Sequence, residues 1–106
     1  MQLVQYSGAE PFVIDDEVTD ALMDYAFELA AHGRHDLVRL AARDAGSSRI
    51  TVTLLLGPGT TLSARSMNML DAVGDDLAAP DLRRRILRVR GLPGSDASPA
   101  AQEQGD

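Results

Sequence analysis

The sequence predicts an α+β fold, a two-layer sandwich in which an antiparallel sheet of about five short strands carries its helices on one face, in the order ββαβββαα. Three observations support this class. Residues Glu17–His32 repeat apolar side chains at helical spacing, Arg49–Leu56 alternate apolar and polar residues, and short β-prone segments are separated by turn residues. Because aromatic residues make up only 4% of the chain and Trp is absent, we expect an aliphatic core.

A chain of 106 residues is long enough for one domain with one modest core. The hydrophobic content of 44% is typical of a folded protein. We assign residues 1–91 to a single α+β domain. From residue 92 to residue 106 Gly, Pro, Ser, Ala and Gln dominate, which predicts a disordered C-terminal tail.

The first third of the chain predicts two strands and one helix. Gln2–Tyr6 and Pro11–Ile14 are short β-prone segments on either side of a loop that contains Gly8. The helix over Glu17–His32 follows two aspartates that can cap it, and Gly33 is a natural residue just past its C-terminus. Its apolar stripe consists of Val18, Leu22, Tyr25, Ala26 and Leu29, and Met23, Phe27 and Ala30 widen it.

The middle of the chain predicts β structure with one ambiguous segment. Residues 36–46 suit a helix by propensity, since Leu, Ala and Arg favour one. They also suit a strand with Val38, Leu40 and Ala42 facing inward, and we favour the strand. Arg49–Leu56 is a strand with its leucines at 54 and 56 on the buried face, preceded by a turn over Asp44–Ser48.

The following segments predict a turn, a strand and two helices. Gly57–Thr60 has proline second and glycine third, the pattern of a type II turn. We expect a strand over Thr60–Arg65 and a helix from Met67 to about Ala78 capped by Ser66. A last short helix restarts over Ala79-Pro80-Asp81 and runs to about Val89, with Leu82, Ile86 and Val89 on one side.

Charge is sorted along the chain, whose formal net charge is −6. Residues 1–33 contain seven carboxylates and no basic residue, whereas all ten basic residues are arginines that begin at Arg34. Such sorting favours docking within the chain or association with a second copy. The exclusive use of arginine, together with many Ala, Gly and Asp residues, suggests a GC-rich bacterial genome.

Two charged groups are candidates for this contact. Asp20, Asp24 and Glu28 lie at positions i, i+4 and i+8 and form a ridge along one face of the first predicted helix. Their expected partners are the arginines of the last helix, chiefly Arg83, Arg84, Arg85 and Arg88, together with Arg90. The same arginines could instead contact nucleic acid. The net negative charge and the lack of a nearby aromatic residue to stack on a base argue against that alternative.

The turn Gly57–Thr61 is a second candidate site. A strand that delivers a glycine-containing loop can expose backbone amides to a phosphate or another anion. The residues of interest are Gly57, Gly59, Thr60 and Thr61. The spacing and the lysine of a phosphate-binding P-loop are both missing, so we favour a hairpin turn.

Nothing in the sequence assembles a catalytic set, so we predict that this protein is not an enzyme and uses no cofactor or metal. Cysteine and lysine are absent, which removes thiolate and Schiff-base chemistry. His32, His35 and Asp36 are residue types that zinc accepts, but Gly33 interrupts their helical spacing. We therefore expect the two histidines to serve the end of the first helix.

These observations predict a small non-catalytic interaction or adaptor protein that binds a second copy of itself as a homodimer. The sheet face opposite the helices supports this prediction, since Ala41 and Leu55 make it partly apolar. A small-ligand or anion-binding domain and a nucleic-acid-binding regulator remain the alternatives. We expect a cytoplasmic location and no membrane partner, because the sequence has neither a signal peptide pattern nor an apolar run of about 20 residues.

Overall fold

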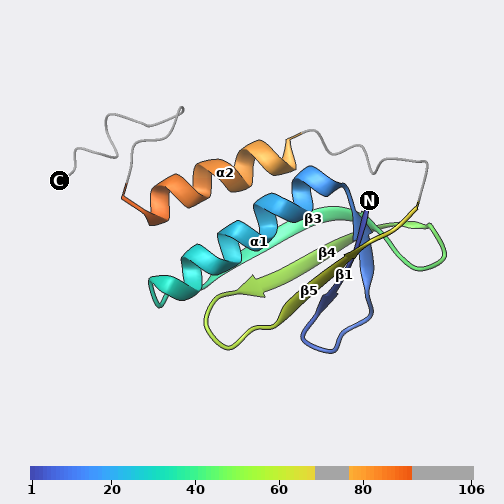
Figure 1. Ribbon diagram of the computed structural model, residues 1–106, viewed down its shortest axis with the longest axis horizontal. Helices are drawn as coiled ribbons and strands as arrows, with labels where there is room; N and C mark the ends of the chain where they lie inside the picture. The colour runs from blue at the N-terminus through green and yellow to red at the C-terminus, as the bar shows by residue number, and fades with distance from the viewer. Residues whose placement is uncertain (69–76, 92–106) are drawn as a thin grey trace.

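The computed structural model describes residues 1–68 and 77–91, which form a five-stranded antiparallel sheet and two helices (Figure 1). Both helices lie on one side of the sheet, and this confirms the predicted α+β class. In chain order the elements are β1 (Gln2–Tyr6), β2 (Phe12–Ile14), α1 (Asp16–Ala31), β3 (Asp36–Arg43), β4 (Arg49–Leu56), β5 (Leu62–Ser66) and α2 (Ala78–Val89).

The sheet has the order β4-β3-β2-β1-β5 and consists of two parts. In one part β3 and β4 pair along eight residues, and in the other β1 pairs with both β2 and β5. The two parts are joined at a single position, where Val13 of β2 lies opposite Arg43 of β3. The join is short because β2 has only three residues before the chain turns into α1.

Helix α1 forms because its apolar residues recur at helical spacing and its end is well satisfied. Val18, Leu22 and Leu29 are buried along the predicted stripe. After the helix Gly33 takes a φ of +64°. The amide of Gly33 donates to the carbonyl of Ala30, and the amide of Arg34 donates to the carbonyl of Leu29. These two bonds are the pattern of a Schellman motif. Helix α1 therefore ends at the predicted glycine.

Helix α2 packs against α1 and beside β3. Its buried residues Leu82, Ile86 and Val89 follow the predicted stripe. The helix begins at Ala78, one residue before the predicted restart over Ala79–Asp81, and Pro80 occupies its first turn. Proline is tolerated there because the first amides of a helix have no partner within the helix.

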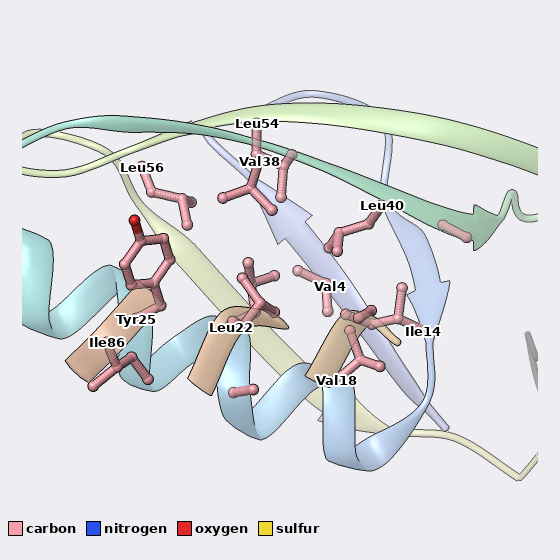
Figure 2. Packing of buried hydrophobic residues seen from close by; sticks show 14 of the residues in the cluster. Val4, Ile14, Val18, Leu22, Tyr25, Val38, Leu40, Leu54, Leu56 and Ile86 are labelled. Atoms are coloured by element: carbon pink, nitrogen blue, oxygen red, sulfur yellow. The ribbon is translucent and has the colours of Figure 1, made fainter. Parts of the chain in front are cut away.

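The core lies between the sheet and the two helices (Figure 2). Ile14, Leu22, Leu29, Leu56 and Leu82 are among its most completely buried side chains. In β3 the residues at 38, 40 and 42 are buried and those at 37, 39 and 41 are exposed, so the ambiguous segment is a strand, as favoured above. The core is aliphatic apart from Phe12 and Tyr25, as the composition predicted.

The predictions for the residues after Gly59 are wrong in part, and in part they lie outside the described residues. Ser66 does not cap a helix. It ends β5, opposite Gln2 of β1, so the strand predicted over Thr60–Arg65 is shifted toward the C-terminus. Most of the helix predicted over Met67–Ala78, and the whole predicted tail after Gly91, lie outside the described residues.

Candidate interaction surface

The two helices are joined by ion pairs between the acidic ridge and the arginines of α2. Nη1 of Arg83 lies 2.5 Å from Oδ2 of Asp24, and Nη2 of Arg90 lies 2.8 Å from Oε2 of Glu28. The hydrogen bond from Arg90 lowers the pKa of Glu28, and the carboxylate in turn raises the pKa of Arg90. Two of the expected charge pairs are therefore formed within one chain.

Three other predicted site residues of the helices lie outside these two ion pairs. Arg84 contacts Asp81 of its own helix, with 3.1 Å between Nη2 and Oδ1, and its expected contact with a carboxylate of α1, in the same chain or in a partner chain, stays a prediction. Asp20 is exposed and lines a hollow of about 280 Å³ between the helices with Pro80 and Arg83. Arg88 lines a separate hollow with His35.

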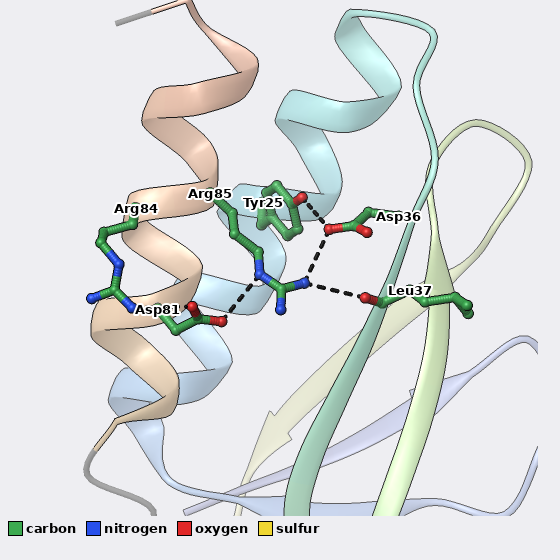
Figure 3. A network of polar contacts seen from close by, with 6 residues as sticks. All are labelled: Tyr25, Asp36, Leu37, Asp81, Arg84 and Arg85. Carbon is green, nitrogen blue, oxygen red and sulfur yellow. Dashed lines mark hydrogen bonds and ion pairs between the residues drawn. The ribbon is translucent and has the colours of Figure 1, made fainter. Parts of the chain in front are cut away.

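A second polar cluster connects α1, β3 and α2 (Figure 3). The Tyr25 hydroxyl donates to Oδ2 of Asp36, and Nη1 of Arg85 donates to the same oxygen at 3.0 Å and to the carbonyl of Leu37 at 3.1 Å. Nε of Arg85 also lies 3.1 Å from Oδ2 of Asp81. Burial, reinforced by the bond to Asp36, raises the pKa of Tyr25 to about 12. Arg85 therefore fastens α2 to the start of β3.

The histidines take up separate positions. Nδ1 of His32 lies 2.9 Å from the carbonyl oxygen of Glu28 at the end of α1, as expected of a helix-end residue. Nε2 of His35 instead lies 3.2 Å from the carbonyl oxygen of Pro58. Asp36 is engaged with Tyr25 and Arg85, so the three candidate metal ligands do not converge. Residues 1–68 and 77–91 contain no group of three or more potential ligand side chains that could hold a metal ion.

The turn between β4 and β5 directs its amides toward its own neighbours. The amide of Gly57 donates to the Thr60 hydroxyl at 3.2 Å, the amide of Thr60 donates to the carbonyl of Gly57, and the amide of Thr61 donates to Oγ of Ser7. Gly59 has a φ of +87°, as the third residue of a type II turn requires. These bonds favour a structural turn over an anion site. The predicted hairpin is wrong, however, because β4 and β5 lie at opposite ends of the strand order and do not pair with each other.

The sheet face opposite the helices, here called the open face, is basic. Side chains alternate along each strand, so the open face carries one residue in two. Its arginines are Arg39, Arg43, Arg49 and Arg65, and the described strands place no carboxylate on it. Arg43 and Arg49 are directly opposed across β3 and β4, an unfavourable arrangement for like charges. The acidic ridge lies on the other side of the molecule.

The open face also carries an apolar pair. Leu37 of β3 lies opposite Leu55 of β4, and their side chains are 62% and 43% exposed. Ala41, four residues after Leu37 on the same face of β3, is exposed as well. The sequence had indicated Leu55 and Ala41 on this face but not Leu37. The alternation within Asp36–Arg43 already contained that signal, since Leu37 precedes the inward Val38.

Comparisons with protein-family models, with curated protein sequences and with solved structures give no match for this chain. Neither of the helices in the described part of the chain is long and apolar enough to cross a membrane.

Proposed function

We propose that this chain is a small, non-catalytic, cytoplasmic interaction protein that associates with a second copy of itself through the open face of β3 and β4. The observation that carries the proposal is the exposed Leu37–Leu55 pair. Both helices cover the other face of the sheet, so these two leucines lie where a second copy can remove them from water (Figure 1).

The positions of the arginines favour one arrangement of the two copies. Leu37 and Leu55 lie at one end of the β3–β4 ribbon, and Arg43 and Arg49 lie at the other, roughly 20 Å away at about 3.3 Å per residue. A two-fold axis near the leucines therefore joins the apolar pairs and holds the two Arg43–Arg49 pairs at opposite ends of the dimer. An isologous contact of this kind is the commonest form of homodimer.

The ion pairs between α1 and α2 have a consequence for this proposal. Arg83 and Arg90 are paired with Asp24 and Glu28 inside the chain, so they are poorly placed to drive association with another molecule or with nucleic acid. The polar groups of the strongest cluster, Tyr25, Asp36 and Arg85, are likewise bonded to one another. Because these polar groups bind one another, they suit a structural role, and this supports the non-catalytic part of the proposal.

Sedimentation velocity on two variants tests the proposal. Leu37→Thr places a strand-favouring β-branched residue at this position but removes the apolar contact, so we expect the dimer dissociation constant to rise about ten-fold or more. The matched control is Phe27→Gln, which removes a larger exposed side chain, 71% exposed on α1, and should leave the dimer intact. A dimer weakened by Phe27→Gln and not by Leu37→Thr, or a wild-type monomer at every concentration, would contradict the proposal.

A further inference from the structure

Within the described residues, one edge of β3 is largely without a strand neighbour. Its other edge pairs with β4 throughout, but on this side the described residues provide only Val13, opposite Arg43. Strand β2 cannot continue along β3, because the chain enters α1 two residues after Ile14. Residues 37–41 of β3 are therefore an edge that β2 does not cover.

The backbone groups of this edge can be oriented from two contacts. Arg85 donates to the carbonyl of Leu37 from the α2 side, away from β4. The Tyr6 hydroxyl accepts a hydrogen bond from the amide of Leu55 and donates one to its carbonyl. Leu37 and Leu55, which lie opposite each other, therefore direct their backbone groups away from the β3–β4 interface on both strands. Since orientation alternates along a strand, the amide and carbonyl of Arg39 and Ala41 also face the uncovered side.

A hollow of about 320 Å³ lies beside this edge. Val38 and Leu40 of β3 line it on one side, and Leu77, Ala78 and Arg84 line it on the other. Figure 3 shows α2 running alongside β3 at this place. The volume is at the lower end of the range for binding pockets, and its lining combines apolar walls with a few charged groups.

We propose that an extended peptide segment of another protein adds to β3 as a strand and lies in the groove between β3 and α2. Backbone hydrogen bonds to Arg39 and Ala41 supply affinity, and alternate side chains of the segment enter the hollow. Arg39 stands on the open face at the middle of the edge, so we expect a carboxylate beside it in the segment. This inference rests on the proposed interaction function and adds a second class of partner to it.

A second copy fits this edge less well than a peptide does. Antiparallel pairing of two β3 edges about a two-fold axis brings Arg39 close to its counterpart, and like charges that face each other across strands are destabilising. The open face, where Leu37 and Leu55 are exposed, suits the second copy better.

Two proline variants test the groove. Ala41→Pro removes one amide of the uncovered edge, and proline is tolerated at such an edge position. Thr51→Pro is the matched control, since Thr51 is the cross-strand partner of Ala41 and its amide faces the far edge of β4. The probe is the best-enriched peptide from a displayed library of linear seven-residue sequences selected on the immobilised full chain, synthesised with a fluorophore for polarisation measurements.

We expect enriched peptides that alternate apolar and polar residues and contain a carboxylate. Ala41→Pro should weaken binding at least about ten-fold and Thr51→Pro less than about two-fold. A peptide N-methylated at the alternate amides that face β3 should not bind the wild-type protein, which tests the strand pairing even if Ala41→Pro fails to fold. Equal effects of the two prolines, undiminished binding of the N-methylated peptide, or a library without enriched peptides would overturn the proposal.

Amide hydrogen exchange separates this proposal from the proposed self-association. The amides of Arg39 and Ala41 should exchange rapidly in the protein without peptide and become protected when the peptide is added. Protection without peptide would mean that the chain itself or a second copy already covers the edge, and would overturn the inference. A dimer that persists while no peptide binds would overturn this inference alone, whereas a monomer that binds the peptide would overturn only the self-association.

Discussion

The hydroxyl of Tyr25 on α1 donates a hydrogen bond of 2.5 Å to the carboxylate of Asp36, the first residue of β3. Arg85 of α2 donates to the same carboxylate oxygen. Three elements that are distant in the sequence are thus joined at one oxygen atom. This junction fixes where α2 lies beside β3, and it therefore shapes the groove proposed above.

Replacing Tyr25 with phenylalanine should destabilise the fold by about 1–3 kcal/mol, because a hydrogen bond to a carboxylate is lost. The pKa of Tyr25 is raised from about 10 in the unfolded chain to about 12 in the folded protein. The stabilisation is therefore fully present below about pH 10 and is lost as the pH rises toward 12. Urea unfolding of both proteins at several pH values measures it, and a difference that grows above pH 10 would contradict the assignment.

Gly57→Ala should be more damaging than Gly59→Ala. A Cβ atom on Gly57 would lie 2.5 Å from the carbonyl oxygen of Arg34 and 2.5 Å from the His35 ring, whereas one on Gly59 has nothing within 4 Å. Both glycines have positive φ, so backbone strain of about 1–3 kcal/mol applies to each and the steric clash to Gly57 alone. Thermal unfolding compares them, and equal losses of stability would show that the turn does not pack against Arg34 and His35.

A double-mutant cycle on Arg83 and Asp24 should give a coupling of about 0.2–1 kcal/mol in the stability of one chain. The coupling is small because both side chains are about half exposed. A cycle on Arg84 and Asp24 is the control and should show almost no coupling, since Arg84 contacts Asp81 instead. Coupling that is larger for Arg84 than for Arg83 would mean that α2 is rotated relative to α1.

Salt should strengthen the self-association. The open face carries four arginines and no carboxylate on its described strands, so two such faces repel each other. Raising the ionic strength from about 0.1 M to 1 M shortens the screening length from about 10 Å to about 3 Å and weakens this repulsion. Sedimentation at the two concentrations measures the effect. A dimer that dissociates at high salt would instead favour contact between the acidic ridge of one copy and the open face of the next.

The local elements of the fold were predictable because their causes are local. Apolar spacing placed α1 within one residue at each end, and Gly33 was identified as the residue after it. Alternation favoured the strand over 36–43 even though propensity alone permitted a helix. Ser66 was misassigned because serine suits a helix cap, while pairing with Gln2, 64 residues earlier, decides its actual place.

The interaction surface was predictable only in part. Sorted charge indicated that the acidic ridge would meet the arginines of the last helix, but not which arginine would meet which carboxylate. Asp36 and Arg85 are 49 residues apart, and no local pattern connects them. The uncovered edge of β3 depends on the strand order and on the early end of β2, both of which are set by long-range packing.

The most direct test of the self-association is an intermolecular paramagnetic relaxation measurement. The chain has no cysteine, so Thr53→Cys on the open face accepts a nitroxide at one site only, and Asp20→Cys on α1 provides the matched control. Each nitroxide-bearing variant is prepared without ¹⁵N and is mixed with the ¹⁵N-labelled wild-type protein. The label at 53 should broaden the amides of Leu37, Thr53 and Leu55 in the other copy, and the label at 20 should not. Broadening confined to α1, or none from either label, would contradict self-association through the open face.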